Sequence, residues 1–407
     1  MQYQEVAGGI CAPKGFAAAG VHCGIRVNHS EKYDLALIKA DVRCAAAGVY
    51  TTNKVCGAPI KVDRAHLADG YAQAIVVNSG NANTCNADGM EKANRMCEIA
   101  AEKLQIAPED VIVASTGVIG QVLPIEPIEN KADELFAHLS KDGGTDAAEA
   151  IMTTDTVKKE AAAVLTLDGK TVTIGGIAKG SGMIHINMGT MLSFLTTDAA
   201  VSSGMLYEAL KEAAGDSYNM VSVDGDTSTN DTLTIMASGK AGNAEITEKN
   251  EDYRAFVQAL TALCKKLSKM LAGDGEGATK LLVCSVTGAK TKEDAKGVAK
   301  TVICSSLLKA AMFGADANWG RVLCAIGYSG CDVDIHKVDV AFASGKGTLP
   351  VCKNGAGIEF SEDKAKEILS EKEITIEVSL NDGSSCAEAY GCDLTYDYVK
   401  INGDYRT

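Results

Sequence analysis

A glycine followed by a threonine, Gly189-Thr190, is the pair of residues with the most specific chemistry in this sequence. Because glycine has no side chain, the Thr190 hydroxyl can approach the Gly189 carbonyl and, in a strained bond, attack it to form an ester. Hydrolysis of that ester leaves Thr190 as the first residue of a new chain. Its free α-amine, with a pKa of about 7.7–8.0, can then act as the base for its own hydroxyl. The pair therefore predicts a self-cleaving protein with a threonine nucleophile, while a turn before a core strand is the simpler interpretation.

Two strand-like runs, residues 171–178 and 191–195, flank a glycine-rich turn and are expected to position Thr190. A second polar turn, Ser115-Thr116-Gly117, follows the apolar run 111–114. Loops at strand ends commonly carry functional groups, although the same three residues are also ordinary turn formers. The sequence therefore offers a nucleophile and a set of hydrogen-bond donors, each at the end of a strand.

The rest of the chain alternates strand and helix patterns, which predicts a mixed α/β fold. Asp168-Gly169 is expected to form the turn of a hairpin over residues 165–174. Further strands are expected at residues 73–78, 110–115, 232–237 and 280–286, with a strand-rich stretch at 373–402. Helices are expected at residues 90–104, 253–271 and 291–314, the last with Thr291 as its N-cap.

Composition excludes several classes of function. The net charge is −14 and the pI about 5.0, which argues against a nucleic-acid or anionic-lipid partner. No membrane span or signal peptide is expected. None of the 14 cysteines forms a Cys-x-x-Cys pair, which favours reduced thiols in the cytoplasm. The six histidines have no metal-site spacing, so no metal is expected. A Gly-x-Gly-x-x-Ala match at residues 273–278 follows a helix and precedes a strand, the wrong order for a dinucleotide site.

The segment 179–192, Lys-Gly-Ser-Gly-Met-Ile-His-Ile-Asn-Met-Gly-Thr-Met-Leu, resembles the cleavage motif of the ornithine acetyltransferase family of arginine biosynthesis. That family usually has proline where this chain has Ile186 and alanine where it has Gly189. We expect cleavage to survive both differences. Similar motifs occur in family order at residues 50–53, 78–83, 115–120, 152–156, 224–231, 273–278, 315–321 and 401–407.

The resemblance implies a layered α/β sandwich of the ornithine acetyltransferase and self-cleaving aminopeptidase type. Cleavage would give an α chain, residues 1–189, that contains the oxyanion hole. The β chain, residues 190–407, would begin with the nucleophile. The two chains are expected to stay interlocked as an α2β2 heterotetramer in the cytoplasm.

The family's functional residues map onto this chain by their motifs. Thr190 would be the nucleophile, and Thr116 and Gly117 would form the oxyanion hole. The matching substrate-binding positions are Thr156, Lys179, Thr190, Glu276, Asn402 and Thr407, with Thr154 a less certain neighbour. From charge, Lys179 would hold a substrate carboxylate and Glu276 the amino group of ornithine.

The implied reaction is acetyl transfer from N2-acetyl-L-ornithine to L-glutamate by a ping-pong mechanism through an acetyl-Thr190 ester. No bound cofactor is expected, and the use of acetyl-CoA as a second acetyl donor is left open. Two alternatives remain. The first is a self-cleaving amidohydrolase or aminopeptidase of the same fold group, and the second is a metabolite-binding protein that never cleaves.

Overall fold

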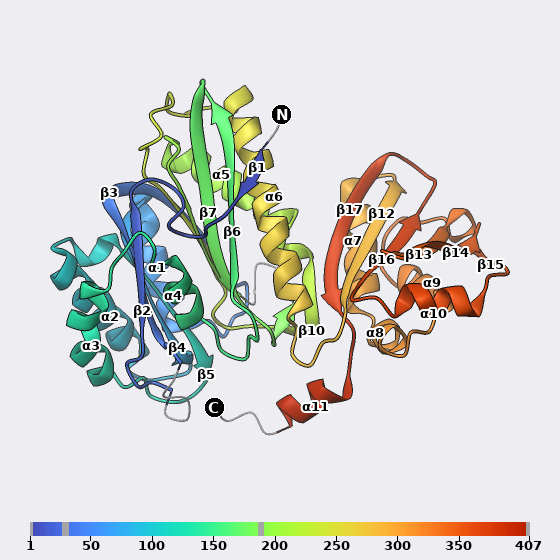
Figure 1. Ribbon diagram of the computed structural model, residues 1–407, viewed down its shortest axis with the longest axis horizontal. Helices are drawn as coiled ribbons and strands as arrows, with labels where there is room; N and C mark the ends of the chain where they lie inside the picture. The colour runs from blue at the N-terminus through green and yellow to red at the C-terminus, as the bar shows by residue number, and fades with distance from the viewer. Residues whose placement is uncertain (1–2, 27–31, 186–190, 404–407) are drawn as a thin grey trace.

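The computed structural model describes residues 3–26, 32–185 and 191–403. These residues form two β-sheets with helices between and around them (Figure 1). The layered α/β architecture expected from the sequence is therefore confirmed. None of the described helices is long and apolar enough to span a membrane.

The first sheet contains strands from both halves of the chain. Its order is β1 (Gln4–Val6), β6 (Lys159–Leu167), β7 (Lys170–Lys179), β9 (Leu192–Thr197), β11 (Thr232–Ala237), β3 (Leu35–Tyr50), β4 (Tyr71–Asn81) and β5 (Val111–Val118), with β2 (Phe16–Val21) also paired to β3. β9 runs antiparallel to β7 and parallel to β11. The proposed boundary between residues 189 and 190 therefore falls in the connection from β7 to β9, two neighbouring strands of this sheet.

The second sheet belongs mainly to the C-terminal half. Its order is β15 (Ala356–Gly357), β14 (Gly347–Lys353), β13 (Asp339–Ser344), β16 (Glu373–Ser379), β12 (Leu281–Ala289), β17 (Ser385–Cys392), β10 (Val221–Thr227) and β8 (Ile184–His185). β8, which directly precedes the proposed cleavage segment, is thus attached to this sheet through β10.

Buried apolar faces explain how the helices cover the sheets. The helices are α1 (Ala58–His66), α2 (Gly89–Leu104), α3 (Glu126–Ala137), α4 (Gly144–Ala150), α5 (Ser203–Gly215), α6 (Glu251–Gly273), α7 (Lys292–Cys304), α8 (Ser306–Phe313), α9 (Trp319–Gly327), α10 (Glu362–Leu369) and α11 (Tyr396–Asn402). α1–α3 and α4 pack on opposite faces of β2–β5. α5 and α6 share a core with the first sheet that also includes Val283 and Tyr390 of the second. The opposite face of the second sheet is covered by α7–α10.

Most of the expected elements are confirmed, and two need correction. β6 and β7 form the expected hairpin, in which Asp168 and Gly169 both have positive φ, as a type I′ turn requires. The helix expected at residues 291–314 is two helices, because the chain leaves the helical conformation at Ser305, whose side chain caps α8. The stretch expected to be strand-rich contains β16 and β17 but ends in α11, a short helix after Thr395.

Candidate active site

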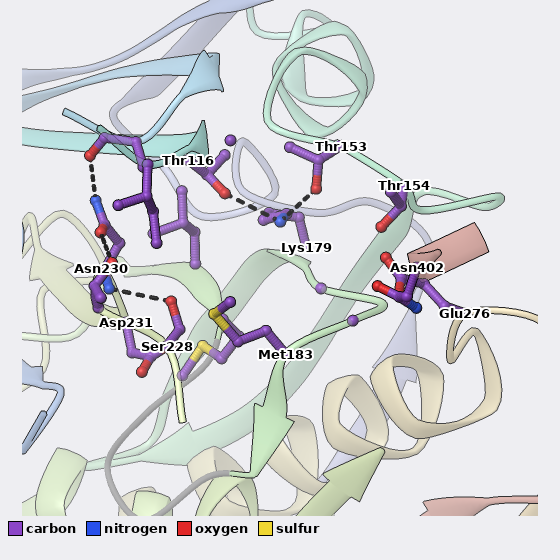
Figure 2. A pocket seen from close by; sticks show the side chains of 18 residues that line it. Thr116, Thr153, Thr154, Lys179, Met183, Ser228, Asn230, Asp231, Glu276 and Asn402 are labelled. Atoms are coloured by element: carbon purple, nitrogen blue, oxygen red, sulfur yellow. Dashed lines mark hydrogen bonds between the residues drawn. The ribbon is translucent and has the colours of Figure 1, made fainter. Parts of the chain in front are cut away.

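A pocket lies where the ends of strands from the first sheet meet the chain that leads into the second (Figure 2). Thr116 and Gly117 come from the end of β5, and Lys179 from the end of β7. Glu276 follows α6, and Asn402 comes from the last turn of α11. Other residues lining the pocket are Thr153, Thr154, Gly182, Met183, Met191, Ser228, Asn230 and Asp231.

The end of β5 requires glycine at position 117. β4 and β5 run parallel there, with Gly80 opposite Gly117. Gly117 has a φ of +135°, and a Cβ on it would lie 2.2 Å from the backbone carbonyl carbon of Gly80. Asn230 holds the same strand end by donating hydrogen bonds to the backbone oxygens of Ser115 (2.9 Å) and Ala82 (2.6 Å).

Lys179 connects the strand ends with the rest of the pocket. Its Nζ donates to the hydroxyls of Thr116 (3.2 Å) and Thr153 (2.7 Å). Burial lowers the pKa of the Lys179 amine, and the Asp155 carboxylate opposes this shift. The described contacts use two of its three N–H groups, so the third can serve a substrate carboxylate.

Behind Lys179 lies a buried group of charges. Asp155 accepts hydrogen bonds from the backbone N–H of Gly180 (2.6 Å) and from Nζ of Lys159 (2.7 Å), which also pairs with Asp274 (2.6 Å). Burial would raise the pKa of Asp155, but the charges of Lys179 and Lys159 outweigh it and bring this pKa to about 2. These charges fix the turn that follows β7.

The two candidate threonines of the 152–156 motif lie in different places. Thr154 lines the pocket, near Glu276 and Asn402 (Figure 2). Thr156 is absent from the described lining, and its hydroxyl donates to Asp274. Asp274 also accepts a hydrogen bond from the Thr156 backbone N–H, at 3.1 Å. The geometry thus places Thr156 as a support for the buried charges, with Thr154 at the pocket wall.

Glu276 and Asn402 meet at the far side of the pocket. The Asn402 side-chain amide donates to Oε2 of Glu276 at 2.7 Å, so the C-terminal helix reaches the site. Gly182 packs directly against this carboxylate, since a Cβ at position 182 would lie 2.2 Å from it. Gly189, Thr190 and Thr407 lie outside the described residues, so their expected roles stay predictions.

The turn that leads toward the proposed cleavage segment is held by hydrogen bonds to Asp224 and Asp274. Met183 has a φ of +54°, which is strained for a residue with a side chain. Asp224 accepts hydrogen bonds from the backbone N–H groups of Met183 (2.6 Å) and Ile184 (2.9 Å). The Ser181 hydroxyl donates to the backbone oxygen of Asp274 (2.6 Å). This network fixes the chain up to residue 184.

Sequence analysis missed five residues that shape the site: Thr153, Asp155, Asp224, Asn230 and Asp231. The motifs 152–156 and 224–231 contain all five, but nothing in the sequence shows which of their side chains are buried. Within the described residues, no group of three or more His, Cys, Asp or Glu side chains is arranged to hold a metal ion.

Comparison with known proteins now adds the family. Residues 17–407 match the ArgJ family. An arginine biosynthesis bifunctional protein, ArgJ 1 of Clostridium acetobutylicum, is 52% identical over 393 residues, which are 96% of each chain. The chain belongs to the ArgJ family. The resemblance stated from the motifs is therefore confirmed.

Two solved ArgJ-type structures are also similar. The arginine biosynthesis bifunctional protein argJ from Bacillus halodurans is 46% identical, with a TM-score of 0.49 over 52% of this chain and 97% of that chain. Ornithine acetyltransferase from Mycobacterium tuberculosis, complexed with ornithine, is 36% identical, with a TM-score of 0.42 over 45% and 97% of the two chains.

Proposed function

We propose that this chain is an acetyltransferase of arginine biosynthesis that moves the acetyl group of N2-acetyl-L-ornithine to L-glutamate through an ester on Thr190. Membership of the ArgJ family supports the activity. The observation that carries the assignment to this site is the composition of the pocket. Thr116, Gly117, Lys179, Glu276 and Asn402 line one pocket together with Met191, which is covalently bonded to residue 190.

The proposal begins with self-cleavage. The Thr190 hydroxyl attacks the Gly189 carbonyl, and the nitrogen of Thr190 leaves as a free amine while an ester forms. Water hydrolyses this ester and gives the carboxyl end of Gly189 and the hydroxyl of Thr190. The carboxylates that hold residues 180–184 support this step, because a fixed approach lowers the entropy cost of bringing hydroxyl and carbonyl together.

Acetyl transfer then follows in two half-reactions. The Thr190 α-amine takes the proton of its hydroxyl as Oγ attacks the acetyl carbonyl, and donors at Thr116 and Gly117 stabilise the oxyanion. Each such donor typically contributes about 2.7–4 kcal/mol. The protonated amine gives its proton to the departing nitrogen of ornithine, which leaves an acetyl ester on Thr190. In the second half-reaction the amine of glutamate attacks that ester, and the bond from the acetyl carbon to Thr190 Oγ breaks. The proton lost by the glutamate nitrogen passes through the Thr190 amine to Oγ, which releases N-acetylglutamate and restores the hydroxyl.

The charged residues suggest how substrates are oriented. Both substrates are amino acids, and we propose that Lys179 binds their carboxylate through its remaining N–H. Glu276, which lines the same pocket, would pair with the side-chain ammonium of ornithine (Figure 2). We also propose that acetyl-CoA serves as a second acetyl donor, because the 52% identical relative is named a bifunctional protein.

The mature enzyme is proposed to be an α2β2 heterotetramer located in the cytoplasm. Light scattering of the purified protein would test the assembly, since one α and one β chain alone would give half the expected mass.

Intact-mass analysis under denaturing conditions tests the activity, before and after addition of N-acetylornithine. We expect two fragments separated at Gly189–Thr190 and one acetyl group added to the fragment that begins with Thr190. A single uncut chain without an adduct would contradict the proposal and favour a metabolite-binding protein. Accumulation of acetate in place of N-acetylglutamate would favour the amidohydrolase alternative.

A further inference from the structure

Asp231 is a buried carboxylic acid for which the mechanism above has no use. It directly precedes β11, lines the pocket and is only 3% exposed (Figure 2). Neither of its side-chain oxygens makes a hydrogen bond of normal geometry with the described residues. Burying a carboxyl group without a hydrogen-bond partner costs free energy, so an unpartnered one calls for an explanation, and a catalytic role is one of them.

The register of the first sheet places Asp231 beside the start of β9. β11 and β9 run parallel with Thr232 opposite Leu192, and the Thr232 N–H donates to the Met191 carbonyl (2.9 Å). Asp231 therefore lies alongside Met191. Residue 190 is bonded directly to Met191, and consecutive Cα atoms of a chain are about 3.8 Å apart.

The described neighbours of Asp231 do not supply a well-placed hydrogen-bond donor to its carboxyl group. Burial raises the pKa of its carboxyl well above the ordinary range, against smaller opposing effects of the Thr51 hydroxyl, the Met191 N–H and Lys179. The Thr51 hydroxyl donates instead to the backbone oxygen of Ser228 (2.9 Å). An uncut chain offers no cation at residue 190, because its nitrogen is then part of a neutral amide.

We propose that the Asp231 carboxyl is the hydrogen-bond acceptor for the free α-amine of Thr190 and so positions the base that activates the nucleophile. This inference rests on the proposed function. Burial favours the protonated form of the Asp231 carboxyl in the uncut chain. A proton passing from this carboxyl to the amine freed by cleavage gives a carboxylate and an ammonium. Loss of one proton from this ammonium to solvent leaves an amine that donates an N–H to Asp231 and keeps its lone pair for the Thr190 hydroxyl.

The other charged groups around the pocket are few. Lys179 faces Asp231 from β7, and Glu276 lies across the pocket after α6. The remaining described neighbours are uncharged: Thr51 after β3, Thr116 and Gly117 of β5, Met191 before β9, Leu192 of β9 and Asn402 of α11. Asp231 is therefore the described carboxylate beside the start of β9, and its charge should raise the pKa of the Thr190 amine.

The test is the pH profile of kcat/KM for acetyl transfer in the Asp231→Asn variant. The neutral amine is the active form, so kcat/KM falls as pH drops below the amine pKa. Without the nearby carboxylate this pKa decreases, and the acidic limb should move to lower pH by about one unit or more. Loss of positioning should lower the maximum of kcat/KM by about 10- to 100-fold.

Asp63→Asn is the matched control. Asp63 in α1 is also fully buried with a raised pKa, but it lies outside the described pocket lining and accepts a hydrogen bond from the Val113 N–H. Its variant should keep the wild-type acidic limb. Asp231→Glu retains the carboxylate and should keep the acidic limb of kcat/KM near its wild-type pH, with a lower maximum. This variant provides the test if Asp231→Asn does not fold.

Intact mass and melting temperature accompany each profile. A cut Asp231→Asn protein with an unchanged acidic limb would overturn the inference. So would an uncut variant of native melting temperature, because Asp231 would then act on cleavage and not on the free amine. A wild-type chain that forms neither fragments nor an acetyl adduct would instead refute the proposed function itself, and this inference with it.

Discussion

At the scale of single residues, Lys179 combines two tasks that the sequence could not separate. It anchors the hydroxyls of Thr116 and Thr153 and keeps one N–H for a ligand. Its motif identified it as a substrate-binding candidate, but only the structure shows that the same amine also contacts Thr116, the proposed oxyanion-hole residue. If both proposed roles hold, one side chain couples substrate binding to the geometry of the oxyanion hole.

We expect Lys179→Gln to lower kcat/KM for N-acetylornithine by about 10- to 100-fold, because it removes a charged hydrogen bond of about 1.5–3 kcal/mol. Steady-state kinetics would measure this. Lys158→Gln is the matched control: Lys158 lies on the surface, pairs with Glu149 and is absent from the described lining of the site. Equal losses in both variants would contradict the role of Lys179.

Gly117 can be tested against Gly120, which also has positive φ but open space around its Cβ position. Gly120→Ala should cost only the backbone strain, about 1–2 kcal/mol of unfolding free energy. Gly117→Ala adds a collision with Gly80, and we expect a cost of about 3 kcal/mol or more, together with loss of acetyl transfer. Denaturant unfolding compares the two, and similar costs would argue against the close approach of β4 and β5.

At the scale of elements, the sequence predicted those whose signals are local. The β6–β7 hairpin follows from Asp168-Gly169, and α6 from its apolar spacing. The break between α7 and α8 was missed because helical apolar spacing continues across Ser305. Serine also occurs inside helices, so the sequence did not show that this one is the N-cap of α8. α11 was missed because it buries none of its residues and so has no apolar stripe. The choice between Thr154 and Thr156 depended on Asp274, 118 residues away from Thr156.

The turn before the proposed cleavage segment depends on hydrogen bonds to Asp224, which can be tested by substitution. Asn in place of Asp224 has a single acceptor oxygen, so Asp224→Asn keeps at most one of the bonds to Met183 and Ile184. Loss of about 1.5 kcal/mol there should slow self-cleavage by about tenfold. Mass spectrometry of freshly translated protein would follow the rate.

Asp34→Asn provides the comparison for that rate. Asp34 also accepts hydrogen bonds from successive backbone amides, those of Cys23 and Gly24, but in a different turn. Its variant should be destabilised yet cleave at the wild-type rate. If both variants cleave equally slowly, general destabilisation explains the effect and the specific role of Asp224 is refuted.

At the scale of the whole molecule, two strands that follow residue 190 lie within one sheet between strands that precede it. β9 and β11 lie between β7 and β3, and β8 joins the second sheet through β10 (Figure 1). After the proposed cleavage, neither residues 1–189 nor residues 190–407 could dissociate without breaking these strand pairings. Dissociation would also divide the hydrophobic core to which both contribute. This arrangement was beyond sequence analysis, because the order of strands in a sheet depends on contacts between distant residues.

Both fragments should therefore elute together in size-exclusion chromatography without denaturant, and should separate only when the fold is lost. Chromatography across a urea series, combined with circular dichroism, would show whether separation and unfolding share one midpoint. Release of either fragment from a folded remainder would contradict the interlocked arrangement.

Gly182 has one more consequence, for the length of side chain that the pocket accepts. Its missing methyl group leaves the space in which the Glu276 carboxylate sits. A larger residue at position 182 would displace that carboxylate toward the opposite wall and shorten the span between Glu276 and Lys179. If Lys179 and Glu276 bind the two ends of a diamino acid, then Gly182 determines how many methylene groups fit between them. Position 182 is then where a designer would begin to retune the enzyme toward shorter homologues of ornithine.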